Sequence, residues 1–179
     1  MFLSDVLDQT IKKLKSQTAN LITLLNLSLG GFAILASING QLDLSMLLIF
    51  VAALADRFDG MVARKFNIQS ELGKQLDSMS DIISFGVAPA MLIYHAVLMD
   101  IGPTGMFFTV FYIACGAFRL ARFNITESNG YFTGLPITAA GCLATLSFLA
   151  TESVSPIFYL FLMCFLSLAM ISPFKLRKV

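Results

Sequence analysis

The sequence predicts an all-α membrane protein with six transmembrane helices and, before them, an amphipathic helix that lies in the membrane interface. Three observations lead to this prediction. Of the 179 residues, 57% are hydrophobic and only 13% are charged, a composition typical of membrane proteins rather than soluble domains. The apolar residues fall into six runs along the chain. Every lysine and arginine falls on one side of the six-helix arrangement that these runs define.

The six apolar runs differ in length. They are residues 20–38, 44–55, 82–99, 103–118, 134–151 and 155–171. Several are shorter than the roughly 20 residues that a helix needs to cross a bilayer. The second and third runs reach this length only if their helices continue into the acidic segments beside them. A soluble helical protein would carry polar stripes at helical spacing throughout, and the other four runs lack such stripes. In the third run, Gly86 and Pro89 predict a bend whose freed carbonyls line a polar cavity.

The basic residues predict the orientation in the membrane. All 12 of them lie before the first span, after the sixth, or around the 2–3 and 4–5 connections. In the opposite loops, the only charged residues are the acidic Asp43, Asp100 and Glu152. By the positive-inside rule, both termini face the cytoplasm, and so do the acidic segments. We therefore expect a multi-pass protein of the inner (cytoplasmic) cell membrane.

The first 18 residues predict an amphipathic helix that lies in the membrane interface. Apolar residues recur there at helical spacing, opposite charged ones. A partly disordered tail is the alternative, and the segment lacks the apolar core of a cleavable signal peptide. We expect three parts in the chain: this helix (1–18), a single six-helix domain (19–172) and a basic cytoplasmic tail (173–179).

Four aspartates interrupt the apolar centre of the chain. Asp56 and Asp59 are three residues apart, and Asp77 and Asp81 are four apart, so each pair shares one face of a helix. Ionised carboxylates inside spanning helices are costly and usually functional. Four that converge could not remain ionised without cations. Oxygen ligands suit Mg²⁺ or Mn²⁺, and the sequence therefore predicts a site for two such divalent cations.

The segment from Asp56 to Asp81 reads DxxDGxxAR-x8-GxxxDxxxD. This pattern resembles the signature of the CDP-alcohol phosphotransferase family, with all of its positions filled. Residues 84–90 (SFGVAPA), 118–124 (FRLARFN) and 134–141 (GLPITAAG) are similar to the integral-membrane phosphatidylserine synthases within that family. The first predicted span also resembles the family's first helix, with Ala19 in place of its usual proline. The resemblance covers residues 19–172.

The resemblance implies an enzyme that transfers the phosphatidyl group of CDP-diacylglycerol to the hydroxyl of L-serine and releases CMP. It also implies that the four aspartates bind the two cations and that Asp81 is the general base. A homodimer is implied as well, and we expect no nucleic-acid partner. The small residues Gly30, Gly31, Gly105 and Gly116 offer packing faces for such a dimer.

Seven residues are expected to contact CDP-diacylglycerol. Gly60 and Ala63 would let the nucleotide approach the backbone, although helix packing explains Ala63 equally well. Arg64 suits a phosphate clamp, and the alternative is an interfacial positive charge. Ser70 can cap the third helix, and by its family position it also touches the nucleotide. The full set is Asn20, Thr23, Gly60, Ala63, Arg64, Ser70 and Gly73.

The serine contacts are predicted near the end of the fourth span. Arg119 and Arg122 lie three residues apart, and a guanidinium group matches the carboxylate of serine in a bidentate way. Asn124 adds a hydrogen-bond donor. Binding of lipid phosphate and simple interfacial anchoring are the alternatives for the two arginines.

Two other functions remain open at this stage. A related phosphatidyltransferase would use another acceptor, such as glycerol 3-phosphate or inositol phosphate, although such an anion calls for a stronger basic cluster. A divalent-cation transporter would use the aspartates as its permeation site, although an arginine beside the ions opposes cation passage.

Overall fold

The structure is a computed structural model of the whole chain. It describes residues 2–66, 71–125, 131–173 and 175–177, with side chains for residues 20–58, 60–61, 71–125 and 134–173. Within these ranges the protein is helical except for one short antiparallel β pair. The predicted all-α class is therefore confirmed apart from this pair.

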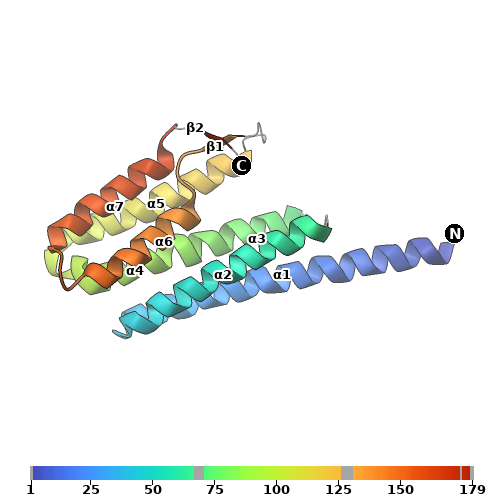
Figure 1. Cartoon of the computed structure of the whole chain (residues 1–179), viewed down its shortest axis with the longest axis horizontal. Helices are drawn as coiled ribbons and strands as arrows, with labels where there is room; N and C mark the ends of the chain where they lie inside the picture. The colour runs from blue at the N-terminus through green and yellow to red at the C-terminus, as the bar shows by residue number, and fades with distance from the viewer. Residues whose placement is uncertain (1, 67–70, 126–130, 174, 178–179) are drawn as a thin grey trace.

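Six helical units follow one another along the chain. The third is one long helix in which α-helical and π-helical turns alternate before a final 3₁₀ turn. The units are α1 (Phe2–Ile38); α2 (Leu42–Phe66); α3 (Glu71–Asp81) with η1 (Ile82–Val87), α4 (Ala88–Ile93), η2 (Tyr94–Leu98) and η3 (Met99–Ile101); α5 (Pro103–Ile125); α6 (Ile137–Ser147) with η4 (Phe148–Ala150); and α7 (Pro156–Ile171). Figure 1 shows α1 and α2 along one side of the bundle, α5 and α7 along the other, and the third unit between them.

Among the described residues, three helices are long and apolar enough to cross a membrane. These are Asn20–Ile38, Glu71–Ile101 and Pro103–Ile125, while Ile137–Ala150 and Pro156–Ile171 are shorter apolar helices. Each helical unit contains most or all of one predicted run, several units extend beyond their runs, and six membrane crossings stay a prediction. The start of α1, the end of α2, the start of α3 and the β pair lie at one end of the bundle (Figure 1). The segments that carry the basic residues therefore gather at one end.

The N-terminal segment does not form a separate helix. Helix α1 runs without interruption from Phe2 to Ile38, so no helix ends at the predicted boundary after residue 18. The chain has no glycine or proline between its start and Gly30. Position 19, where the resemblance leads one to expect a proline, holds alanine, which does not interrupt a helix as proline does. The location of residues 1–18 in the membrane interface stays a prediction.

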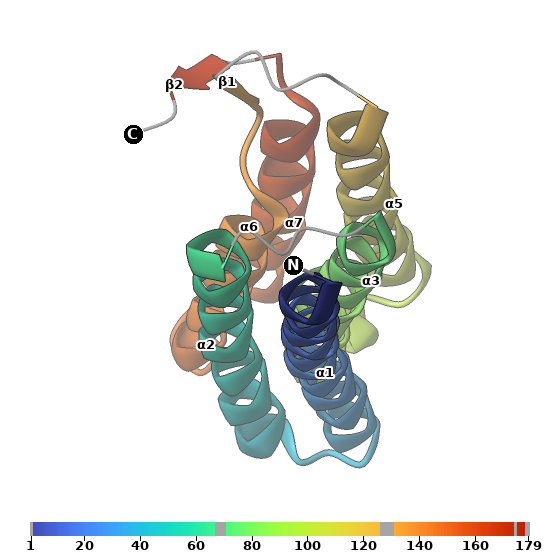
Figure 2. The same cartoon turned by 90° about the vertical axis from the view of Figure 1, so that its right-hand side faces the viewer.

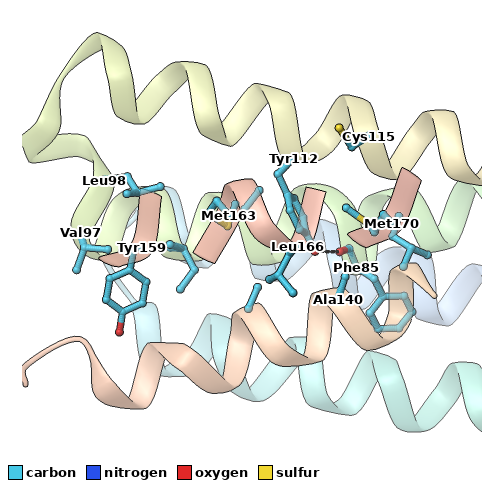
Figure 3. Close-up of a cluster of buried hydrophobic side chains, with 14 of the residues drawn as sticks. Phe85, Val97, Leu98, Tyr112, Cys115, Ala140, Tyr159, Met163, Leu166 and Met170 are labelled. Carbon is cyan, nitrogen blue, oxygen red and sulfur yellow. Dashed lines mark hydrogen bonds between the residues drawn. The ribbon is translucent and has the colours of Figure 1, made fainter. Parts of the chain in front are cut away.

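The third unit is loosened where Gly86 and Pro89 predict it. The π-helical turn η1 ends two residues before Pro89. Proline has no N–H and cannot donate to the carbonyl four residues earlier, which is that of Phe85. The hydroxyl of Tyr112 on α5 donates to this carbonyl instead, at 3.2 Å (Figure 3). A neighbouring side chain thus satisfies the freed carbonyl, which corrects the expectation that it lines a polar cavity.

The main core lies where α5, α6 and α7 pack around the third unit. Figure 3 shows its fully buried aromatic and sulfur-containing side chains, among them Tyr112, Tyr159 and Met163. Close helix contacts depend on glycine here. A Cβ on Gly141 would lie 2.7 Å from the Phe85 carbonyl oxygen, and one on Gly116 would lie 2.9 Å from the Ile137 side chain. Small residues at such contacts let membrane helices approach closely.

Serine hydroxyls hold α1 against its two neighbours. Ser37 on α1 and Ser45 on α2 are hydrogen-bonded at 2.8 Å. On the other side of α1, Ser80 donates to the Thr23 carbonyl at 3.3 Å and Ser84 donates to the Asn26 carbonyl at 3.0 Å. Such interhelical hydrogen bonds stabilise helix pairs that lipid tails surround. They fix the height of α1 relative to α2 and α3.

The C-terminal segment pairs with the connection between α5 and α6. Strand β2 (Lys175–Arg177) lies antiparallel to β1 (Tyr131–Thr133), beside the ends of α5 and α7 (Figure 2). The sequence predicts a basic tail here and no strand. After β1 the chain turns at Gly134, whose φ is +76°. A Cβ there would collide with the carbonyl oxygen of Met170, so both the backbone conformation and the space require glycine.

The glycines that the sequence offered for a dimer face mostly pack within the chain. A Cβ on Gly30 would collide with Ser84, one on Gly105 with the Leu98 carbonyl, and one on Gly116 with Ile137. Gly31 alone of these four faces open space. The homodimer stays a prediction, but three of its four proposed contact residues already serve contacts inside one chain.

We expect alanine at Gly30 to destabilise the protein and alanine at Gly31 not to. The Gly30→Ala methyl group meets the Cα of Ser84 at 2.8 Å as well as its hydroxyl, and overpacking of this kind costs about 1–3 kcal/mol. Gly31→Ala should be neutral or slightly stabilising, since alanine is favoured over glycine within helices by roughly 0.5–1 kcal/mol. Thermal unfolding of the two variants in detergent tests this. Equal unfolding midpoints would contradict the close α1–η1 contact.

Candidate metal and substrate site

Three of the four predicted aspartates converge in the structure. Asp56 lies in the second half of α2, Asp77 in the middle of α3, and Asp81 at the end of α3. One carboxylate oxygen from each lies within 4.8 Å of the others. The side chain of Asp59 falls outside the described side chains, and its backbone lies one turn beyond Asp56 in α2. The predicted meeting of the two acidic helix faces is therefore present for these three residues.

The cluster has the properties of a cation site. Asp77 is exposed, while Asp56 and Asp81 are half-buried. Asp81 interacts electrostatically with both of the other carboxylates. One of its oxygens is buried and, among the residues that the structure describes, has no hydrogen-bond partner. A buried acceptor among like charges is costly, and a divalent cation would relieve both the repulsion and the missing partner. The residues present thus fit Mg²⁺ or Mn²⁺.

A buried arginine lies beside this cluster. Arg119 on α5 is only 8% exposed, and its charge interacts with that of Asp81. Its guanidinium carbon lies 6.0 Å from the centre of the Phe123 ring. Within the described part of the chain, its Nε atom is buried without a hydrogen-bond partner. A buried guanidinium with a free donor is suited to bind an anionic group that enters the site.

The two arginines that the sequence grouped together have different surroundings. Arg122 is half-buried and donates from Nη1 to the carbonyl of Ile171 at 3.5 Å. This contact links the end of α5 to the end of α7. Arg119 instead lies deep in the bundle, next to Asp81. Interfacial anchoring, one of the alternatives for both residues, does not describe the buried Arg119.

Asn124 also has a partner within the protein. Its amide nitrogen donates to the Ser78 hydroxyl at 2.9 Å, and Ser78 lies next to Asp77 in α3. The same hydroxyl lies 3.1 Å from the carbonyl of Lys74. Asn124 therefore connects α5 to the helix that carries two of the acidic residues. The sequence alone gave no sign of this contact, because the two residues are 46 positions apart.

The residues predicted to contact the donor lie on α1, α2 and α3. Gly60 and Gly73 are half-buried, Asn20 is half-buried and Thr23 is buried. Ala63 and Arg64 belong to the last turns of α2, and their side chains fall outside those that the structure describes. Ser70 lies outside the described residues, directly before the first residue of α3.

Comparisons with known proteins identify the family. The model of the CDP-alcohol phosphatidyltransferase family matches residues 16–172. The chain is 40% identical over 157 residues to the CDP-diacylglycerol–serine O-phosphatidyltransferase of Bacillus subtilis, which covers 87% of this chain and 86% of the relative. It is 41% identical over 174 residues to the archaetidylserine synthase of Methanothermobacter thermautotrophicus, which covers 94% of this chain and 73% of the relative. The chain belongs to the CDP-alcohol phosphatidyltransferase family.

Removal of one charge from the acidic cluster should keep or raise the stability of the protein but weaken its binding of a cation. Asp56→Asn relieves repulsion, so we expect its thermal midpoint in chelator to equal or exceed that of the unaltered protein. Saturating Mn²⁺ should stabilise the unaltered protein, by about 2.7 kcal/mol at a hundredfold excess over the Kd, and stabilise Asp56→Asn far less. Thermal unfolding with and without Mn²⁺ measures both effects. Asp43→Asn, at the opposite end of α2, is the matched control, and an equal Mn²⁺ effect in both variants would contradict the cation site.

Proposed function

We propose that this chain is a membrane-embedded enzyme that transfers the phosphatidyl group of CDP-diacylglycerol to the hydroxyl of L-serine and releases CMP. The observation that carries this proposal is the convergence of Asp56, Asp77 and Asp81 next to the buried Arg119. The names of the relatives from Bacillus subtilis and Methanothermobacter thermautotrophicus support serine as the acceptor.

The acidic residues hold the reaction centre. We assign Asp56, Asp59, Asp77 and Asp81 as the ligands of two divalent cations. When bound, such cations neutralise the diphosphate of the donor and stabilise the departing CMP. The remaining contribution of the protein is to position the reacting groups and to stabilise charge. The donor contacts that we propose are Asn20, Thr23, Gly60, Ala63, Arg64, Ser70 and Gly73.

Asp81 is the proposed general base. A serine hydroxyl is a weak acid and needs a nearby acceptor for its proton. A carboxylate has two oxygens, so Asp81 can hold a cation with one of them and accept that proton with the other. As the proton leaves, the serine oxygen bonds to the β-phosphorus of the donor. The bond between this phosphorus and the oxygen of CMP breaks.

Arg119 is the proposed partner of the serine carboxylate. Its Nε has no partner among the described residues, and its charge lies next to Asp81. A serine whose carboxylate binds Arg119 would place its hydroxyl near the base. Arg122 and Asn124 belong to the same end of α5, and we propose that they support this pocket through their contacts with Ile171 and Ser78.

The setting of the enzyme is part of the proposal. We place all six helical units across the inner membrane, with both termini and the acidic cluster at the cytoplasmic face. The gathering of the basic segments at one end of the bundle supports this orientation. A homodimer is proposed from the family resemblance, with residues 19–172 forming the enzymatic domain. Because α1 is continuous from Phe2 to Ile38, we propose that residues 1–18 extend this helix on the cytoplasmic side.

Incorporation of labelled serine into lipid tests the function. The purified chain, with CDP-diacylglycerol in mixed micelles and Mg²⁺ or Mn²⁺, should form labelled lipid and CMP in equal amounts, and a chelator should stop both. Glycerol 3-phosphate and inositol phosphate should not replace serine. Asp81→Asn should abolish turnover yet retain part of its binding to CDP-diacylglycerol, while Asp43→Asn stays active.

Three results would overturn parts of this proposal. Full activity of Asp81→Asn would reject the base. CMP release with another alcohol but not with serine would reject the acceptor. Cation flux through proteoliposomes without CMP release would favour a transporter.

The two arginines should respond differently to substitution by lysine. Arg119→Lys keeps the charge but loses the paired donors that match a carboxylate. Loss of a hydrogen bond to a charged group is worth about 1.5–3 kcal/mol. We therefore expect the KM for serine to rise roughly ten- to hundredfold, more than kcat falls. Arg122→Lys should leave the KM for serine within about twofold, since lysine keeps a donor for the carbonyl of Ile171, the contact through which we propose that Arg122 supports the pocket. Steady-state kinetics at saturating donor measures both, and equal effects would reject Arg119 as the specific contact.

A further inference from the structure

Helix α1 carries a buried polar side chain that is not part of the acidic cluster on α2 and α3. Asn26 on α1 is only 1% exposed, and its amide oxygen is buried. Within the described side chains, this oxygen has no hydrogen-bond partner. A buried amide oxygen without a partner is destabilising, so its presence on a helix that packs between two others indicates a bound group.

The height of Asn26 follows from the serine pair that joins α1 and α2. Ser37 and Ser45 face each other across these antiparallel helices at 2.8 Å. Asn26 lies eleven positions from Ser37, and Asp56 lies eleven positions from Ser45 in the same spatial direction. At 1.5 Å per residue, both are about 16 Å from the serine pair. Asn26 and Asp56 therefore lie at the same height.

The direction of the two side chains follows from the same spacing. Eleven residues at 100° each make three full turns and only about 20° more. Asn26 thus shares the face of α1 that Ser37 turns toward α2, and Asp56 shares the face of α2 that Ser45 turns toward α1. Between them, Ala33 on α1 and Ile49 on α2 are fully buried in one cluster. The contact between the helices continues from the serine pair toward the acidic end.

The contact with the third unit places Asn26 beside Asp81 as well. Ser80 donates to the carbonyl of Thr23, and Ser84 donates to that of Asn26. Helices α1 and α3 are therefore parallel. A Cβ on Gly30 would lie 2.8 Å from the Cα of Ser84, so Gly30 is the residue of α1 at the height of Ser84. Asn26 precedes Gly30 by four residues and Asp81 precedes Ser84 by three, which is about one turn in each case. Asn26 therefore lies at about the height of Asp81, as it does at that of Asp56.

We propose that Asn26 belongs to the cation site, where its amide oxygen lies at the inner end of the acidic cluster and helps to bind the divalent cation. This inference rests on the cation binding assigned under the proposed function. Carboxylates and an amide oxygen are all acceptors, and acceptors that converge attract a cation rather than one another. The sequence analysis gave Asn26 no role of its own.

Direct Mn²⁺ binding without substrates tests the inference. The purified chain is titrated with Mn²⁺, and the free ion is followed by its electron paramagnetic resonance signal. Asn26→Leu keeps the approximate shape of the side chain and removes the oxygen. We expect its Kd for Mn²⁺ to rise about ten- to hundredfold, as for other groups that support metal sites. Asn26→Asp keeps an oxygen and should bind Mn²⁺ at least as tightly as the unaltered protein.

Two controls make the result specific. Asn39→Leu, at an exposed asparagine after the end of α1, should leave the Kd unchanged, and Asp56→Asn should raise it. The thermal midpoint of Asn26→Leu in chelator should equal or exceed that of the unaltered protein, because the change removes a buried amide oxygen that has no partner among the described side chains.

Two outcomes overturn the role of Asn26 alone. One is an unchanged Kd in Asn26→Leu while Asp56→Asn binds Mn²⁺ weakly. The other is Asn26→Asp losing as much affinity as Asn26→Leu, since that would indicate a requirement for shape rather than for an oxygen. A chain that binds no Mn²⁺ at all would overturn the cation site of the proposed function and this inference together.

Discussion

Repulsion among carboxylates is the constraint on which this structure depends. Asp56, Asp77 and Asp81 hold oxygens within 4.8 Å of one another at the end of a helical bundle, and nothing in the hydrophobic effect favours that arrangement. It persists because the helices that carry these residues are fixed elsewhere. Packing away from the charges offsets the cost of the convergence, and a divalent cation would offset the repulsion directly.

The packing that fixes the helices uses very small groups. Gly30, Gly105 and Gly141 allow backbone contacts that a single methyl group would prevent. Serine hydroxyls on α2 and the third unit then set the height of α1. Among lipid tails, apolar burial gives helices little reason to prefer one another, so close approach and interhelical hydrogen bonds carry the specificity. The position of the acidic cluster is thus determined by residues outside the cluster.

Much of this arrangement could be predicted from the sequence, and the reason is periodicity. Apolar runs gave the six helical units, and the spacing of Asp56, Asp77 and Asp81 gave the faces that meet. What could not be predicted is the set of contacts between segments distant in the chain. Asn124 contacts Ser78, and Arg119 is buried whereas Arg122, three residues later, is only half-buried. The sequence did not predict a continuous α1, because the boundary after residue 18 was placed where the family resemblance begins. Ala19, in place of the proline, permits the helix to continue.

The bond between Tyr112 and the Phe85 carbonyl has a consequence for biosynthesis. In a membrane helix, the backbone N–H and C=O groups are normally hydrogen-bonded within the helix itself, and an unpaired carbonyl in lipid is costly. Here the acceptor belongs to the third unit and the donor to α5, which is synthesised later. Until α5 arrives, the Phe85 carbonyl lacks both its usual helical donor, which Pro89 cannot supply, and the hydroxyl of Tyr112. The two elements should therefore mature as a pair, and the reaction centre can take its final form only after the second half of the chain has been made.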